Sequence, residues 1–305
     1  MSYRHLLPAL ILIAAISPFV NAAPAKLRTV SDDDQPDIQT LLRDLHASIE
    51  DGKASYESIR IVSQISRLGP QATPAVDILI ELLGKPFDDC DEQLRVCPNN
   101  AAHCLYESKI CPGAEIRKYD YLTPYASAAL KQIGVAALPK LSVAVVEEGL
   151  SEESFNRRSV AAEIMASIGP PAIPFLSDTL RHSDYSKKRL ALEALHTILA
   201  NDPSSGNQLT SFVPYITPFL DGNFETIDQA IDVLGAIGPG AAEAVPRLTE
   251  LLSYNRVLGH MACPVGERTG YIFQSKAVDA LTKIGTPEAL KAVEQIKVSS
   301  SDQFR

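Results

Sequence analysis

Apolar residues recur along most of the chain at the spacing of one face of an α-helix. A nine-residue unit carries a small or apolar residue at its first, fifth and eighth positions and usually closes on Gly. Positions i, i+4 and i+7 lie on one side of a helix, so each unit predicts a helix with one buried stripe. The unit occurs six times, at residues 61–69, 126–134, 161–169, 191–199, 230–238 and 277–285.

A turn and a second apolar helix follow the units. The closing Gly suits the left-handed backbone just past a helix end, and Pro70, Pro170 and Pro239 directly after it stop the helix. A second Pro, such as Pro139 or Pro174, falls in the first turn of the next helix, where its missing N–H is not needed. Second helices are predicted at residues 76–83, 138–146, 173–180, 245–252 and 290–296.

This order of helix, Ile-Gly-Pro turn and helix resembles the HEAT-like repeat family, in the short form also found in phycobilisome lyases. The resemblance covers residues 54–297 and implies an all-α solenoid of about five to six stacked helix pairs. The family often places a basic residue ahead of the Ala of the first helix. Arg158 and Lys188 match that feature, whereas Thr123 and Ile227 depart from it, so no continuous basic ladder is expected.

Two features modify the regular stack. An amphipathic helix within residues 37–53 precedes the first unit, and we expect it to cap the open apolar face of that repeat. The fourth unit ends in Leu199 instead of Gly and continues into the polar run 201–206. A longer loop there should bend or slacken the stack.

The first residues predict export. Arg4 precedes an apolar run, residues 6–20, and small residues follow up to Ala22, which is typical of a secretory signal cleaved after that residue. The alternative, a membrane anchor, fits less well because the run is shorter than the ~20 residues of a spanning helix and is interrupted by Pro8 and Pro18. Residues 1–22 are therefore assigned to a signal peptide, residues 23–36 to a flexible leader and residues 298–305 to a tail, and the location is periplasmic or secreted, with no membrane span after cleavage.

Unequal spacing between the closing glycines locates two insertions. Gly134 and Gly169 are 35 residues apart, but Gly69 and Gly134 are 65 apart. The larger insertion, residues 86–121, holds four cysteines at seven-residue intervals, which in an exported chain favour disulfides over a metal site, since no C-x-x-C pair is present. These cysteines are Cys90, Cys97, Cys104 and Cys111.

The seven-residue interval equals two helical turns, so consecutive cysteines share a helix face. A turn signal at residues 98–100 would fold two such helices into a hairpin. Sulfurs nearest the turn then meet first, which predicts that Cys97 pairs with Cys104 and Cys90 with Cys111. The stapled helical hairpin either stabilises an insertion that is poor in apolar residues or presents a rigid knob for binding.

The smaller insertion, residues 254–270, contains His260, Met261 and Cys263. These are ligands that suit a soft metal such as Cu(I). The simpler interpretation is an odd cysteine that is buried, paired with another chain or paired with one of the other four. We therefore predict no metal site and no cofactor.

Composition and charge exclude several functions. The chain has 28 basic and 37 acidic residues, a formal net charge of −9, so it lacks the basic surface that a nucleic-acid partner requires. Nucleophile, zinc-hydrolase and phosphate-loop motifs are absent from the sequence. The acidic pairs at residues 147–148 and 152–153 are expected to be solvated, and His196 is expected to pack on a helix or face the solvent.

Two functions remain. The first is a non-catalytic scaffold that binds a protein or peptide on a surface built from the second helices. The second follows from the resemblance to bilin lyases, which implies action on a chromophore or its carrier protein. The predicted export and disulfides disfavour a cytoplasmic lyase, so we favour the scaffold.

Overall fold

The structure is a computed structural model that describes residues 37–49, 56–88, 118–119, 122–252 and 266–302. In these ranges the regular secondary structure is helical apart from two paired two-residue strands, and short turns join the helices. The predicted signal peptide and leader lie outside the described residues, and so do all five cysteines: Cys90, Cys97, Cys104, Cys111 and Cys263. The stapled hairpin and its pairing therefore remain predictions.

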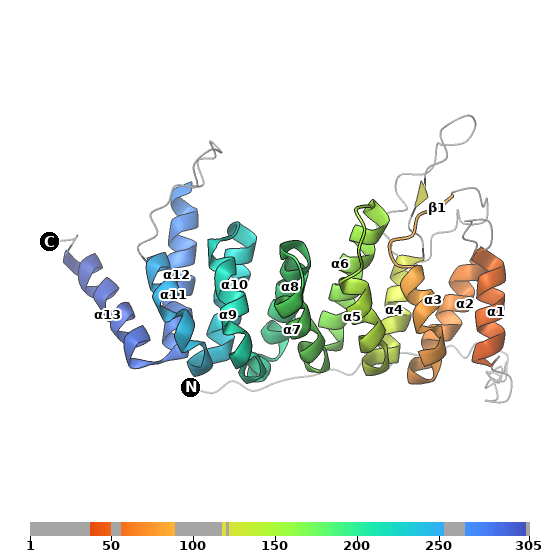
Figure 1. Ribbon diagram of the computed structural model, residues 1–305, viewed down its shortest axis with the longest axis horizontal. Helices are drawn as coiled ribbons and strands as arrows, with labels where there is room; N and C mark the ends of the chain where they lie inside the picture. The colour runs from red at the N-terminus through yellow and green to blue at the C-terminus, as the bar shows by residue number, and fades with distance from the viewer. Residues whose placement is uncertain (1–36, 50–55, 89–117, 120–121, 253–265, 303–305) are drawn as a thin grey trace, which may run out of the picture. The chain divides into compact units, whose positions relative to one another are not determined.

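The first helices of the repeats form one layer. They are α2 (Tyr56–Arg67), α4 (Thr123–Ile133), α6 (Glu152–Ile168), α8 (Tyr185–Asn201), α10 (Phe224–Ile237) and α12 (Gly266–Ile284). Each packs against the next in chain order, α2 on α4 and so on to α10 on α12 (Figure 1).

The second helices form the other layer. They are α3 (Val76–Glu81), α5 (Leu138–Val145), α7 (Ile173–His182), α9 (Val213–Ile216), α11 (Val245–Leu252) and α13 (Pro287–Asp302). Again neighbours pack in order, α3 on α5, α5 on α7 and α7 on α9, and each of α5, α7 and α11 also packs on the first helix that follows it. Sequential packing of helix pairs confirms the all-α, solenoid-type prediction.

The buried stripes are those that the nine-residue unit predicts. In the third copy Ala161 and Met165 are buried and Ile168 is half-buried. A buried side chain of the size of Leu or Met stabilises the fold by about 1.5–3 kcal/mol relative to an exposed one. The core is therefore a continuous row of such stripes between the two layers.

Left-handed glycines end five of the first helices. Their φ angles lie between +54° and +90°, a region that L side chains rarely adopt. They are Gly69, Gly134, Gly169, Gly238 and Gly285. After four of them the chain reverses direction through a short 3-10 segment: η3 (Gly69–Ala75), η6 (Gly134–Ala137), η7 (Pro170–Ala172) and η10 (Gly238–Ala244).

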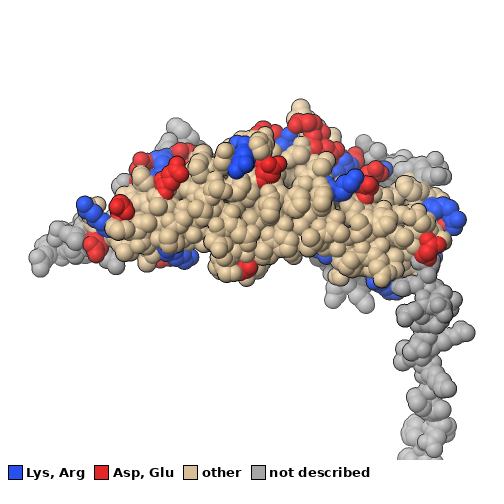
Figure 2. Space-filling model, turned by 60° about the horizontal axis from the view of Figure 1, so that its bottom comes forward, with Lys and Arg blue, Asp and Glu red and all other residues tan. Residues whose placement is uncertain are grey.

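These turns hold almost no charge. The four segments contain one charged side chain, Glu243, and otherwise consist of small, apolar and uncharged polar residues. Figure 2, in which the bottom of Figure 1 comes forward, accordingly shows a broad uncharged area with charged side chains gathered mainly along one margin.

One apolar stretch is long enough to cross a membrane by length and hydropathy alone, the 23 residues Thr123–Val145. It is not one continuous helix. The chain breaks at Gly134, with φ +71°, and α4 and α5 pack in different layers, where residues such as Leu130 and Leu141 are completely buried. The apolar character of this stretch therefore reflects two core helices.

The fourth repeat departs from the others, as the missing Gly indicates. Helix α8 continues to Asn201, and a ten-residue 3-10 helix, η8 (Pro203–Phe212), precedes the four residues of α9 and then η9 (Thr217–Asp221). The expected slackening is wrong, because η8 packs against α10. A Cβ atom on Gly206 would lie 2.1 Å from the carbonyl oxygen of Ala236, so the two backbones touch.

The structure gives the helices within three of the predicted regions. The cap is α1 (Ile38–Ile49), which buries Leu41 and Leu45 beside α2. Helix α12 begins at Gly266, so residues 266–270 of the predicted insertion 254–270 are helical. Helix α13 runs to Asp302 through part of the predicted tail 298–305, because its serines neither lack an N–H nor break a helix as Gly or Pro would.

The base of the larger insertion is a short antiparallel strand pair, β1 (Phe87–Asp88) with β2 (Lys118–Tyr119). Thr123 links the flanking helices beside it: its hydroxyl donates to the carbonyl of Leu82 at 3.2 Å and accepts from the N–H of Gly84 at 2.7 Å. Thr123, one of the two departures from the basic position, thus connects two repeats.

Candidate functional site

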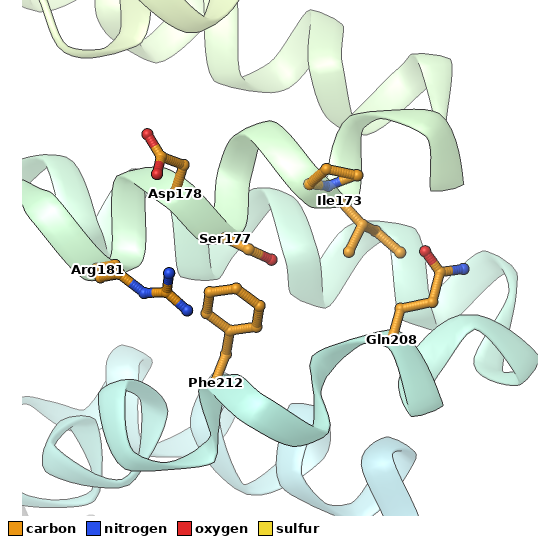
Figure 3. A pocket seen from close by; sticks show the side chains of 7 residues that line it. Ile173, Ser177, Asp178, Arg181, Gln208 and Phe212 are labelled. Carbon is orange, nitrogen blue, oxygen red and sulfur yellow. The ribbon is translucent and has the colours of Figure 1, made fainter.

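A groove lies on the second-helix layer between α7 and η8. Its volume is about 290 Å³, at the lower end of the range for ligand pockets. Ile173, Ser177 and Arg181 lie at i, i+4 and i+8 on one face of α7 and form one wall. Gln208 and Phe212 of η8 form the other wall (Figure 3). We call this site the Arg181 groove.

Arg181 is held by aromatic rings. Its guanidinium carbon lies 5.0 Å from the centre of the Phe212 ring and 5.7 Å from that of Tyr215. Attraction between a guanidinium and an exposed aromatic face contributes about 0.5–1 kcal/mol. Arg181 is exposed and forms no salt bridge with any described residue. The N–H groups of its planar guanidinium are therefore held in place and remain available to bind a carboxylate.

Ser177 adds a buried hydroxyl. The residue is 1% exposed, and its Oγ has no hydrogen-bond partner among the described residues. In Figure 3 the hydroxyl points into the space between Ile173 and Gln208. An unpaired buried hydroxyl costs about 1–3 kcal/mol, a cost that a ligand could relieve.

Other helical hydroxyls in this protein avoid that cost. Ser167 donates to the carbonyl of Glu163 at 2.9 Å, and Thr249 donates to that of Val245 at 2.8 Å, each four residues earlier. Thr179, two residues from Ser177, does the same with Phe175 at 3.3 Å. Ser177 therefore differs from these three hydroxyls, each of which has a carbonyl partner.

Asp178 lies at the edge of the groove. Its Oδ1 lies 2.9 Å from His182 Nδ1, one turn further along α7, and both side chains are well exposed. In Figure 3 the carboxylate points away from Arg181. The groove thus presents one cation, one amide and one hydroxyl on an apolar floor.

A second, smaller hollow of about 120 Å³ lies between α10 and α12. Lys276 Nζ is 2.6 Å from Asp228 and 2.8 Å from Asp232, and His196 Nε2 is 3.2 Å from the same carboxylate of Asp232. These residues come from α8, α10 and α12, so the network links three consecutive first helices.

The network shifts the pKa values of its members. Burial alone would raise the pKa of Asp232, but hydrogen bonds from His196 and Lys276 outweigh it and the pKa lies below its usual value. Burial would lower the pKa of Lys276, but hydrogen bonds to Asp228 and Asp232 raise it. Both groups are therefore held in their charged forms.

The acidic pairs expected to be solvated are mostly ion-paired. Arg157 lies 2.8 Å from Glu147 and 2.6 Å from Glu153, and Glu148 pairs with Lys187. The interpretation as a solvated face is wrong for Glu147 and Glu153, which are partly buried and fix the connection between α5 and α6. Glu148 is exposed as expected and pairs from that connection with Lys187 of α8. Glu152 is exposed as expected.

The two predicted family-like basic positions differ in role. Arg158 is buried and donates to the carbonyls of Glu147 at 3.2 Å and Gly149 at 2.9 Å. In the next repeat Lys188 occupies the matching position and is partly buried, and the buried cation is its neighbour Lys187. Both buried cations fix loops between repeats and lie away from the groove.

The sequence did not predict the Arg181 groove. The fourth unit, without its Gly, indicated an irregular repeat, and this irregularity produces η8 with Gln208 and Phe212. Ser177 and Arg181 could not be paired with η8 from spacing. No cluster of three potential metal ligands occurs among the described residues.

Comparisons with known proteins add little. No family model matches the chain, and no curated protein matches it. Among solved structures, a crystal structure of an engineered protein is similar, with 15% sequence identity over 80% of this chain and 98% of that one and a TM-score of 0.36.

Proposed function

We propose that this protein is a non-catalytic scaffold of HEAT type that binds a protein or peptide through its second-helix layer. The observation that carries the proposal is the Arg181 groove, where a cation held by two rings lies beside a buried hydroxyl that has no partner in the described part of the chain. The repeated left-handed glycines and Pro-containing turns support the HEAT type.

The size and composition of the groove favour a peptide over a chromophore. A volume of about 290 Å³ accommodates a few small side chains but not an extended cofactor. If the protein acts as a lyase, the purified protein should absorb visible light or accept a chromophore. If it is a scaffold, it should be colourless.

The proposed setting is the periplasm or the extracellular space, after cleavage behind Ala22. The four clustered cysteines would then form the Cys90–Cys111 and Cys97–Cys104 bridges. Mass spectrometry of protein from its natural host tests both the cleavage and the bridges. We expect an N-terminus at Ala23, and we expect peptide maps made without reduction to contain the two bridged peptide pairs. An intact Met1 in the soluble fraction would contradict export, and a Cys90–Cys97 bridge would contradict the hairpin.

The binding function is tested by capture from an envelope extract of the natural host, using immobilised mature protein. Arg181→Gln removes the groove cation. Lys140→Gln is the matched control, because Lys140 is an exposed cation on α5 in the same layer and pairs with Asp77 at 3.1 Å outside the groove. A partner that Arg181→Gln loses and Lys140→Gln retains is the expected result. Equal capture by both variants would exclude the groove as the site.

A further inference from the structure

We infer that the Arg181 groove binds an extended peptide that presents an acidic, a small and an apolar residue at alternate positions. The inference rests on the proposed function and specifies its ligand. The acidic side chain would meet Arg181, the small residue would let the peptide backbone reach Ser177, and the apolar residue would cover Ile173.

The spacing along α7 matches an extended chain. Ile173, Ser177 and Arg181 are four residues apart, which corresponds to about 6 Å along a helix axis. Alternate residues of an extended peptide are about 6.6 Å apart and point to the same side. A peptide lying along α7 therefore presents every second residue to successive wall residues of the groove.

The charge of the groove favours a carboxylate over a phosphate. Arg181 is the one cation among the residues that line it, and Asp178 places a carboxylate on the same helix, three residues away. A carboxylate carries one negative charge and matches the guanidinium fork. A phosphate group carries about two, so it would leave charge unmatched beside Asp178.

The buried hydroxyl favours a main-chain partner. Ser177 is 1% exposed and its Oγ is covered from solvent, so a ligand on the floor reaches the hydroxyl once the Ser177 side chain rotates toward the groove. An extended peptide brings unpaired backbone N–H and C=O groups to such a floor, and a hydroxyl can accept from the first or donate to the second. A bulky residue at this position would hold the backbone away, which is why a small one is inferred.

The test uses fluorescein-labelled pentapeptides and the full mature chain, with binding read by fluorescence polarisation. The peptides are Glu-Ser-Ala-Ser-Val and its reverse, Val-Ser-Ala-Ser-Glu, because the groove admits either chain direction, and the same two with Gln in place of Glu. One Glu peptide should bind about tenfold or more tightly than its Gln counterpart, as expected for a charge-assisted hydrogen-bond pair. Equal affinity for Glu and Gln peptides would overturn the inference.

Variants separate the two contacts. Arg181→Gln should remove the preference for Glu over Gln. Ser177→Ala should weaken both peptides by the same factor and keep the preference, and Lys140→Gln should change neither. A Ser177→Ala protein that binds both peptides as the parent does would exclude the backbone contact.

Two further arms exclude other occupants. A phosphoserine peptide that binds more tightly than the Glu peptide would show that the site prefers phosphate to a carboxylate.

The leader contains Asp32, Asp33 and Asp34, and changing all three to Ser in the full chain should leave peptide affinity unchanged. A rise in affinity would show that the leader itself fills the groove, against the inference.

The outcomes also distinguish this inference from the proposed function. If no pentapeptide binds but a partner is captured in an Arg181-dependent manner, the scaffold stands and the acidic-peptide inference fails. If peptides bind with the expected preference and the extract yields no such partner, the chemistry of the groove stands and its use as a partner site in that extract fails.

Discussion

The Arg181 groove and the hollow between α10 and α12 differ in how each treats its cation. Lys276 lies between two carboxylates, and His196 completes the network from a third helix. Arg181 contacts two aromatic rings instead, and no described carboxylate pairs with it. Lys276 is neutralised by carboxylates of the protein, so it joins neighbouring repeats. Arg181 is held in place but not neutralised, so it is available to a ligand.

The difference arises from the connections. In regular repeats a short turn brings the next helix close, and facing side chains on first helices complete each other's charges. In the fourth repeat the longer η8 itself lies against α7 and lines the space with Phe212 and Gln208.

Gly206→Ala should have the largest effect. The added Cβ would lie 2.1 Å from the carbonyl oxygen of Ala236, so η8 must move away from α10. Because the clash is with backbone, we expect a loss of about 3 kcal/mol in the free energy of unfolding, measured by urea denaturation. Asn207→Ala, at an exposed neighbour in the same segment, is the control and should change little. A Gly206→Ala protein as stable as its parent would show that η8 is not fixed against α10.

Lys276→Met should destabilise more than Arg181→Met. Removing Lys276 leaves two partly buried carboxylates facing each other, at a cost of about 1–2 kcal/mol. Arg181→Met removes one contact with two rings at the surface and should cost about 0.5 kcal/mol. Urea denaturation of both variants at neutral pH measures the difference, and a reversed order would refute the contrast between the two sites.

The contribution of the Lys276 network to the free energy of unfolding should fall at both acidic and alkaline pH. The pKa of Asp232 is lowered in the folded state, so its stabilisation is present above its unfolded pKa of about 4 and is lost as pH falls through the folded value. The pKa of Lys276 is raised, so its stabilisation is present below about 10.4 and is lost as pH rises through the folded value. The stability difference between the parent and Lys276→Met should thus be largest between about pH 5 and 10. A difference that is the same at pH 3 would contradict this.

Ser177→Ala should have the smallest effect on stability, and of opposite sign. It removes a buried hydroxyl that lacks a partner among the described residues, so the unliganded protein should be unchanged or more stable by up to about 1 kcal/mol. Thr179→Val is the comparison, because it removes a hydroxyl that donates to Phe175. A clear loss of stability in Ser177→Ala, read from thermal unfolding, would indicate that the hydroxyl has a structural role.

Local patterns predicted the repeats because their determinants are close in sequence. The stripe of Ala161, Met165 and Ile168 and the turn at Gly169 are set by helix geometry within nine residues. The groove was not predictable in this way. Its walls are about thirty residues apart in the chain, and they meet because η8 packs on α7 and, through the backbone of Gly206, on α10. The spacing of apolar residues along the chain does not predict such a long-range contact.

The closed base of the larger insertion has a consequence for how the protein can vary. Strands β1 and β2 pair Phe87 with Tyr119, and Thr123 bonds both Leu82 and Gly84 across the same junction. These contacts between described residues hold α3 and α4 at a fixed distance. Deletions, duplications or foreign sequences between the paired strands should leave the register of the repeats unchanged, which makes this junction a natural graft point for evolution and for protein engineering.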